Sequence, residues 1–280
     1  MSFSCLKRTF LAASLIIVAA SPANADTLRI ATEGAYPPWN FVDSAGELKG
    51  FEVDLAREVC AEMERTCEIV VQDWDGLIPA LKAKRYDVIL ASMTITEERR
   101  KAISFTSPYI QTPSQFAVLK SHKLATRELL SSTIALDKND EAVKQAVGQL
   151  ATALDGMVIG VQGSTVFARF LEQYLDGVGT VLTYDSQENL DLDMRSGRVD
   201  VALADVAYWK PFMKTADGKD LTLIGPAMRG GVFGEGIGAG VRQEDTALLT
   251  AFDAALKAVE AKGVTGKLSE QWIGFDVTAF

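Results

Sequence analysis

The chain has 280 residues, a formal net charge of -9 at pH 7 and 48% hydrophobic residues. The acidic charge disfavours binding to nucleic acid or to anionic lipid, because both select basic surfaces. The length and hydrophobic content suit two α/β lobes of ordinary size, with a core that needs no special stabilisation.

The first 25 residues have the pattern of a cleavable secretory signal. Lys7 and Arg8 precede the apolar stretch 10–20, and the small residues at 23–25 form the expected cleavage site. The apolar stretch is shorter than the roughly 20 residues that span a membrane. We therefore expect residues 1–25 to be removed together with Cys5, leaving an exported chain of net charge -11 without membrane insertion.

The next part of the chain alternates between strand and helix patterns. The predicted order is strand 27–32, helix 50–63, strand 67–71, helix 74–84 and strand 87–90, followed by strand 115–119. This βαβαβ order predicts a mostly parallel sheet with right-handed crossovers, covered by helices on its faces.

The second half repeats this organisation after a less regular segment that ends in a predicted helix, 141–154. The predicted elements are strand 157–161, helix 165–174, strand 180–184, helix 187–196, strand 200–204, strands 221–225 and 236–241, and helices 245–262 and 266–272. The glycine-rich segment 230–240 lacks the spacing and the context of a dinucleotide-binding loop. We interpret it as a turn and strand beside a hinge.

These patterns predict two lobes joined by two hinge crossovers. The first lobe is expected to contain residues 26–115 and 224–280, and the second residues 116–223. The crossovers are expected near 115–118 and 221–225. Two sheets with polar residues at their strand ends predict a ligand-binding cleft between the lobes.

Polar residues follow the buried strand of the first lobe. The sequence YDVILASMTITEERR at 86–100 carries Ser92, Thr94 and Arg99 directly after an apolar run, with Thr96 as the predicted N-cap of a short helix. Ligand sites lie at the carboxyl ends of parallel strands, and a guanidinium binds a carboxylate through two parallel hydrogen bonds. Arg99 is therefore a candidate carboxylate clamp; the alternative is a surface ion pair with Glu97 or Asp54.

The second lobe presents a similar set of polar groups. Its predicted strand 200–204 ends at Asp205, and the turn before helix 165–174 carries Ser164 and Thr165. A carboxylate opposite Arg99 suits an ammonium, and a helix N-terminus adds backbone donors. The structural alternative for Asp205 is an N-cap of the following helix.

The two cysteines of the exported chain, Cys60 and Cys67, are expected to form a disulfide in an oxidising compartment. Their spacing does not match a CxxC redox or metal motif, and the one histidine, His122, lies far away in the sequence. We expect neither a metal nor a cofactor.

Several segments in a fixed order resemble a known family. They are IATEGAYPPWNF, GFEVDLAREVC, WDGLIPALKAKRYDVILASMTITEERR, ISFTSPY, IGVQGST, MRSGRVDVALAD, GIGAGVR and LSEQWIG. They resemble the polar amino-acid receptors of ABC importers, the extracellular solute-binding proteins of family 3 with a type II periplasmic-binding fold. The lysine/arginine/ornithine, histidine and opine (octopine, nopaline) branches are the most similar.

The resemblance implies a monomeric periplasmic receptor without enzymatic activity, which delivers an amino acid or opine to an inner-membrane ABC permease. It assigns the ligand α-carboxylate to Arg99, the α-ammonium to Asp205 and a cationic side chain to Glu33. The other expected ligand-binding residues are the aromatic walls Tyr36 and Trp74, the polar contacts Ser92, Thr94, Ser164 and Thr165, and the lining residues Ala91, Met93 and Val161. The structural alternatives are core positions for the aromatics and a solvated rim position for Glu33.

Charge indicates the class of ligand. Arg99, Asp205 and Glu33 sum to -1, so a cationic amino acid such as arginine, ornithine, lysine or histidine balances the site, whereas a neutral ligand leaves Glu33 unpaired. Ala91 and Val166 make one end less polar than in the basic amino-acid receptors, and the long segment 121–154 resembles the opine branch. An opine ligand is therefore the alternative.

Two other classes of function are disfavoured. A periplasmic enzyme of the cyclohexadienyl dehydratase type requires a general acid or base over its substrate, and Glu33 is the one evident candidate. A sensory role would have to act through a partner, because the chain encodes no kinase.

Overall fold

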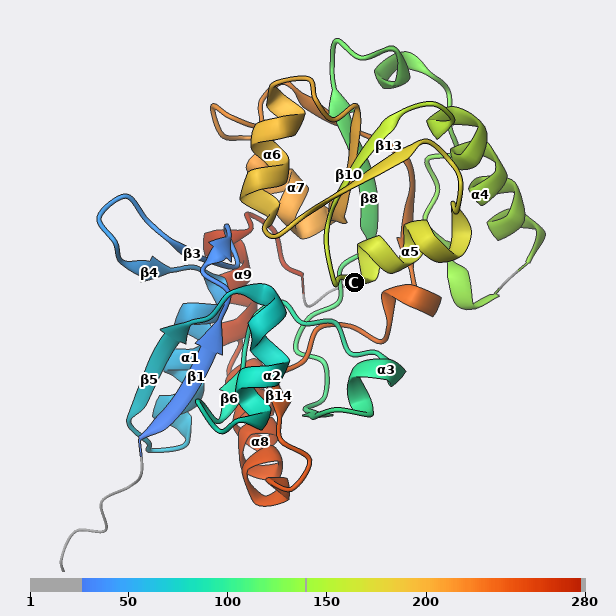
Figure 1. The fold of residues 1–280 in the computed structure, drawn as a ribbon. Helices are drawn as coiled ribbons and strands as arrows, with labels where there is room; N and C mark the ends of the chain where they lie inside the picture. The colour runs from blue at the N-terminus through green and yellow to red at the C-terminus, as the bar shows by residue number, and fades with distance from the viewer. Residues whose placement is uncertain (1–26, 139, 278–280) are drawn as a thin grey trace, which may run out of the picture.

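The computed structural model describes residues 27–138 and 140–277, which form two α/β lobes (Figure 1). The predicted secretory signal, residues 1–25, lies outside the described residues. One lobe contains the first elements of the chain and the last helices, and the other is built from the middle of the chain.

The first lobe is built on a five-stranded sheet with a smaller sheet beside it. In spatial order the strands are β5 (Cys67–Val71), β1 (Leu28–Thr32), β6 (Val88–Ile89), β14 (Gly240–Val241) and β7 (Ser104–Phe105). β5, β1 and β6 are parallel, and β14 is antiparallel to both of its neighbours. The antiparallel small sheet contains β2 (Ala35–Tyr36), β3 (Asn40–Val42) and β4 (Leu48–Lys49).

Helices of the first lobe cover its sheet. They are α1 (Phe51–Glu62), α2 (Leu77–Lys82) after the 3-10 turn η1 (Trp74–Gly76), α3 (Glu97–Arg100), α8 (Thr246–Ala261) and α9 (Val264–Trp272). α1 packs against α8 and α9, so the end of the chain completes the lobe that its beginning starts.

The second lobe has a six-stranded sheet. In spatial order its strands are β11 (Thr180–Tyr184), β10 (Val158–Gln162), β12 (Val201–Asp205), β8 (Ser114–Leu119), β13 (Leu221–Arg229) and β9 (Ile134–Ala135). Its helical elements are α4 (Glu141–Leu154), α5 (Val166–Tyr174), α6 (Gln187–Arg195), α7 (Val206–Phe212) and the 3-10 turns η2 (Lys123–Thr126), η3 (Leu136–Lys138) and η4 (Gly231–Phe233). β11, β10 and β12 are parallel.

Burial explains why the central strands are apolar. All five residues of β12 and both residues of β6 are buried, as expected for strands covered on both faces. One apolar cluster joins Leu28 and Val88 of the first lobe to Tyr208 and Trp209 of the second. The lobes therefore pack against each other beside their strand ends.

The predicted order of the main strands and helices in each lobe is confirmed, but several parts differ. The predicted strand 236–241 is reduced to β14, and the short strands β7 and β9 were not predicted. Helix 74–84 begins as a 3-10 turn and ends at Lys82. The small sheet β2–β4 and helix α7 had no clear periodicity, because short strands and a seven-residue helix give too few repeats to recognise.

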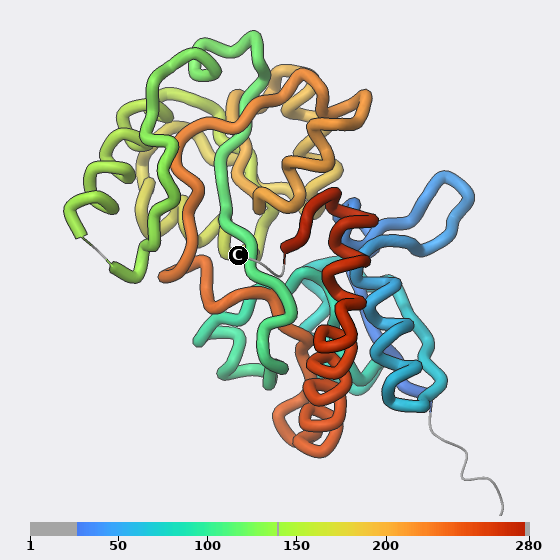
Figure 2. The backbone as a smooth tube through the Cα atoms, turned by 180° about the vertical axis from the view of Figure 1, so that it is seen from behind, coloured from blue at the N-terminus to red at the C-terminus, as the bar shows by residue number. Residues whose placement is uncertain are grey.

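The return to the first lobe comes later than residue 224. β13 continues in the second sheet to Arg229, with an irregularity between Ile224 and Met228. Gly225 adopts a positive φ of 67° there, so the glycine marks a distortion inside the strand and not its end. The two segments that connect the lobes are residues 110–114 and 229–237. Figure 2 shows them side by side between the lobes, where Ile110 forms a β-bridge with Ile237.

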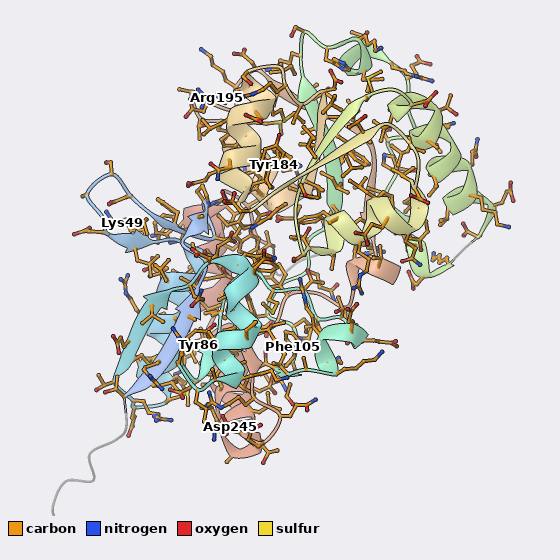
Figure 3. The ribbon with its side chains drawn as sticks, in the orientation of Figure 1. Lys49, Tyr86, Phe105, Tyr184, Arg195 and Asp245 are labelled. Carbon is orange, nitrogen blue, oxygen red and sulfur yellow. A yellow bond between two sulfur atoms is a disulfide. The ribbon has the colours of Figure 1, made fainter. Side chains whose placement is uncertain are left out.

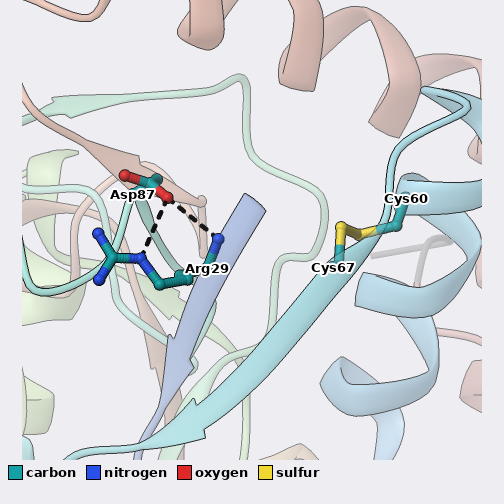
Figure 4. Close-up of a disulfide and its surroundings, with 4 residues drawn as sticks. All are labelled: Arg29, Cys60, Cys67 and Asp87. Atoms are coloured by element: carbon teal, nitrogen blue, oxygen red, sulfur yellow. Dashed lines mark hydrogen bonds and ion pairs between the residues drawn. A yellow bond between two sulfur atoms is a disulfide. The ribbon is translucent and has the colours of Figure 1, made fainter. Parts of the chain in front are cut away.

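The expected disulfide joins Cys60 of α1 to Cys67 at the start of β5 (Figure 4). Nearby, the backbone N–H of Arg29 in β1 donates to Asp87 Oδ2 at 3.0 Å. The disulfide thus ties α1 to β5, and the hydrogen bond ties β1 to the residue that precedes β6.

Replacing both cysteines by serine should lower the free energy of unfolding by about 2 to 3 kcal/mol, because closing a short loop removes conformational entropy from the unfolded chain. Urea unfolding of the oxidised protein and of the Cys60→Ser/Cys67→Ser variant measures this difference. Wild-type protein reduced with dithiothreitol is the control and should match the variant. Equal stability of all three samples would contradict the expected contribution.

Candidate functional site

A cavity of about 50 Å³ lies between the lobes and is lined from both of them. Its lining residues are Glu33, Tyr36, Trp74, Ala91, Ser92, Thr94, Arg99, Thr112, Ser114, Gln162, Thr165, Val166, Phe167, Asp205, Phe233 and Ile237. Nine of these are among the twelve predicted ligand-binding residues. The strand ends of the two sheets therefore meet at one cavity, as their parallel order predicts.

Arg99 is the third residue of the short helix α3 and reaches across to the second lobe. Its Nη1 donates to Thr94 O at 2.9 Å and its Nη2 to Ser164 O at 3.2 Å. The guanidinium carbon lies 5.2 Å from the centre of the Trp74 ring, a cation–π arrangement. Burial lowers the pKa of Arg99 to about 10, so the side chain stays charged at neutral pH. Among the described residues, the alternative surface pair of Arg99 with Glu97 or Asp54 is not formed, and Asp54 pairs with Arg57.

The turn before α5 supplies the opposite wall. Thr165 is the N-cap of α5: its Oγ1 accepts from Ala168 N at 3.2 Å and donates to Gln162 O at 2.7 Å. Ser164 adopts a positive φ of 56° and presents its backbone carbonyl to Arg99. Ser164 itself does not line the cavity, whereas Thr165 does.

Asp205 ends β12, lines the cavity and is also the N-cap of α7, which was the structural alternative. Its Oδ1 caps α7 by accepting from Tyr208 N at 2.7 Å, and its Oδ2 accepts from the hydroxyl of Tyr36 in the first lobe. Tyr36 stacks on Tyr208 with ring centres 4.7 Å apart. Burial raises the pKa of Asp205 to about 6, and the hydrogen bonds from Tyr36 and Tyr208 oppose this shift.

Glu33 follows β1 and is 6% exposed, which excludes a solvated rim position. Its Oε1 accepts from Gln162 Nε2 of the second lobe at 2.6 Å. Burial raises the pKa of Glu33 to about 7; the Gln162 hydrogen bond lowers it, and the nearby carboxylate of Glu52 raises it. A cation beside Glu33 would favour its charged form.

Some predicted residues lie away from the cavity. Met93 is buried in a cluster with Leu77 and Ile95, and Val161 is buried in the core of the second lobe. Ser92 and Thr94 line the cavity, whereas the side chain of Met93 between them packs into the cluster with Leu77 instead.

Six lining residues were not identified from the sequence: Thr112, Ser114, Gln162, Phe167, Phe233 and Ile237. Gln162 ends β10 just as Asp205 ends β12, and this shared position was the available signal. Phe233 and Ile237 lie in the glycine-rich segment, where apolar side chains between glycines were the only indication.

Within residues 27–138 and 140–277, no group of three or more His, Cys, Asp or Glu side chains is arranged to hold a metal ion. The helices in the same ranges include none that is long and apolar enough to cross a membrane.

The buried Glu33 should make stability depend on pH. Its folded-state pKa of about 7 lies above the ordinary value of 4.5, so its contribution to the free energy of unfolding is complete below about pH 4.5 and is lost as the pH rises through 7. Glu33→Gln resembles the protonated form and should lack this contribution to the pH dependence. Urea unfolding of ligand-free protein between pH 4 and 8 should show the variant gaining stability relative to wild type at the higher pH. A constant difference across this range would contradict the prediction.

Comparison with known proteins agrees with this architecture. A profile of bacterial extracellular solute-binding proteins, family 3, matches residues 28–275. An octopine-binding periplasmic protein of Rhizobium meliloti is 38% identical over 98% of this chain and 99% of its own. An L-arginine-binding protein of Pseudomonas aeruginosa is 35% identical over 89% of each chain.

Solved structures show the same fold. A periplasmic binding protein of Salmonella typhimurium with high arginine specificity superposes with a TM-score of 0.73 and 27% identity, covering 88% of this chain and 99% of its own. A His/Glu/Gln/Arg/opine family-binding protein from Silicibacter pomeroyi, in complex with lysine, gives a TM-score of 0.70 and 30% identity over 90% of this chain and 99% of its own. The protein therefore belongs to family 3 of the bacterial extracellular solute-binding proteins and has their two-lobed type II fold.

Proposed function

We propose that this protein is the periplasmic receptor of an ABC importer, which encloses a cationic amino acid and presents it to an inner-membrane permease. The observation that carries the proposal is one cavity lined by the guanidinium of Arg99 and the carboxylates of Asp205 and Glu33. A ligand with one carboxylate and two cationic groups balances these charges; arginine, ornithine and lysine are of this kind, and so is histidine when its imidazole is protonated. Relatives named for binding arginine, histidine and lysine/arginine/ornithine support it.

Each ligand group has a suitable partner in this proposal. The fork of Arg99 binds the α-carboxylate, since two of its N–H groups are used by carbonyls and others remain for the ligand. Asp205 accepts a hydrogen bond from the α-ammonium. Glu33 binds the cationic end of the side chain, and Trp74 and Tyr36 flank the aliphatic part.

Lobe closure follows from the contacts across the cavity. Glu33 bonds to Gln162, Tyr36 to Asp205, and Arg99 to Ser164, and each pair joins the two lobes. Pockets that hold small molecules typically enclose about 300–1,000 Å³, so the lobes have to separate to admit a ligand. The two connecting segments at 110–114 and 229–237 allow this as a hinge motion of a monomer.

An opine is the second candidate ligand. The 38% identity to the octopine-binding protein extends over 98% of this chain, including the segment that forms β9 and α4. Opines such as octopine carry a second carboxylate and a secondary ammonium. The extra carboxylate cancels one positive charge of the ligand and leaves the excess negative charge of the cavity unbalanced, so the charges favour a cationic amino acid.

A ligand panel tests the proposed function. Arginine, ornithine, lysine and histidine should raise the melting temperature, because a ligand that binds only the folded state stabilises it by mass action. Octopine, nopaline and glutamine are included in the same thermal-shift and calorimetry series. Stabilisation by the opines alone would select the second candidate, and stabilisation by none of these compounds would refute both. Turnover of prephenate or arogenate would identify an enzyme instead.

Substitution of Arg99 tests the carboxylate clamp. Arg99→Ala should abolish measurable arginine binding in calorimetry, and Arg99→Lys should restore little, because an ammonium lacks the planar fork of donors. Arg57→Ala is the matched control: Arg57 forms an exposed ion pair with Asp54 on α1 and does not line the cavity. Near-native affinity of Arg99→Ala would remove the assignment.

A further inference from the structure

Glu52 is a buried carboxylate that does not line the cavity. It lies in the first turn of α1, is 1% exposed, and is surrounded by hydrogen-bond donors. Its Oε1 accepts from the backbone N–H of Ser92 at 2.6 Å and from the hydroxyl of Tyr109, and its Oε2 accepts from Asn40 Nδ2 at 2.6 Å. These donors come from three separate segments of the first lobe.

The first of these bonds ends at the cavity. Ser92 lines the cavity and adopts a positive φ of 49°, an uncommon conformation for a residue other than glycine. Its Oγ is buried and has no hydrogen-bond partner among the described residues. The bond from Ser92 N to Glu52 holds the backbone that carries this hydroxyl.

The other two bonds also lead to the cavity wall. Asn40 Oδ1 accepts from the backbone N–H of Gly34 at 2.7 Å, so Asn40 connects Glu52 to the residue that follows Glu33. Gly34 has a positive φ of 78°, which fixes the turn between Glu33 and β2. Tyr109 N donates to the carbonyl of Ile237 at 2.9 Å, and Ile237 lines the cavity.

We propose that Glu52 is a positioning residue for the ligand cavity: through Ser92 N and through Asn40 it sets the backbone of the two segments that carry Ser92 and Glu33. Its chemistry suits this task, because a carboxylate presents only acceptors and its three neighbours present donors to it. The effect of Glu52 on the backbone does not depend on which ligand the protein binds. The effect on affinity rests on the proposed function.

Reversing the polarity of one hydrogen bond tests the proposal. In Glu52→Gln the new amide N–H faces Asn40 Nδ2, so that two donors oppose each other. If the Asn40 amide rotates to accept the new N–H, its oxygen leaves the Gly34 N–H without an acceptor. In Asn40→Asp two carboxylates face each other. In the double variant Glu52→Gln/Asn40→Asp, the carboxylate introduced at position 40 accepts from the new amide and still accepts from Gly34 N, which restores every pair with unchanged net charge.

Two measurements apply to these variants and to a control. Amide hydrogen exchange at Gly34 and Ser92 needs no ligand, and calorimetry uses L-arginine as the probe. The control is Tyr86→Phe, which removes a buried hydrogen bond to Leu77 O in the same lobe without touching the cavity. Figure 3 labels Tyr86 in the first lobe, near α2.

Glu52→Gln should speed exchange of the Gly34 amide and weaken arginine binding, each by about tenfold, the cost of one unpaired buried group. The double variant should recover to within about threefold of wild type in both measurements. Tyr86→Phe should lower the urea midpoint while leaving affinity and both amides unchanged.

Wild-type exchange and affinity in Glu52→Gln would overturn the proposal, as would a double variant that does not recover. Should Glu52→Gln fail to fold, the double variant decides: a folded protein with near wild-type values supports the positioning role, and a misfolded or weakly binding one refutes it. If wild-type protein does not bind arginine, the proposed ligand class is wrong and amide exchange alone decides the role of Glu52.

Discussion

The structure depends on the enclosure of unlike charges between two lobes. Arg99, Asp205 and Glu33 lie around one cavity, where the two carboxylates are buried and the guanidinium is partly buried. Burying a charge is costly unless a partner balances it. These groups bond to the Ser164 carbonyl, the Tyr36 hydroxyl and the Gln162 amide, each from the opposite lobe. In the proposed function, a ligand with complementary charges replaces these contacts, so that lobe closure and ligand recognition are one event.

The fold determines where these charges lie. Parallel strands bring their carboxyl ends to one edge, and the two sheets face each other across the hinge, so residues far apart in sequence meet. Behind the first-lobe wall, Glu52 connects the segments of Ser92, Glu33 and Ile237 by hydrogen bonds from Ser92 N, Asn40 and Tyr109. The precision of the site thus depends on a residue that does not line it.

Sequence reasoning located the principal groups because they obey a positional rule. Arg99 comes after an apolar strand and Asp205 ends one, and in the structure both residues line the cavity. Position relative to a strand did not predict the direction of single side chains or the path of the chain at glycines. Met93 lies between two lining residues but points away, and Gly225 distorts β13 without ending it. Phe233 lines the cavity from a glycine-rich turn, and the conformation of such a turn cannot be predicted from hydrophobic periodicity.

Calorimetry with arginine and citrulline, which share a size and shape but differ in side-chain charge, tests the central claim most directly. We predict that wild-type protein binds arginine far more tightly than citrulline, because a neutral side chain leaves Glu33 desolvated without a cation. In Glu33→Gln this preference should largely disappear. Equal affinity of wild-type protein for the two ligands, or an undiminished preference in Glu33→Gln, would contradict recognition by enclosed charge.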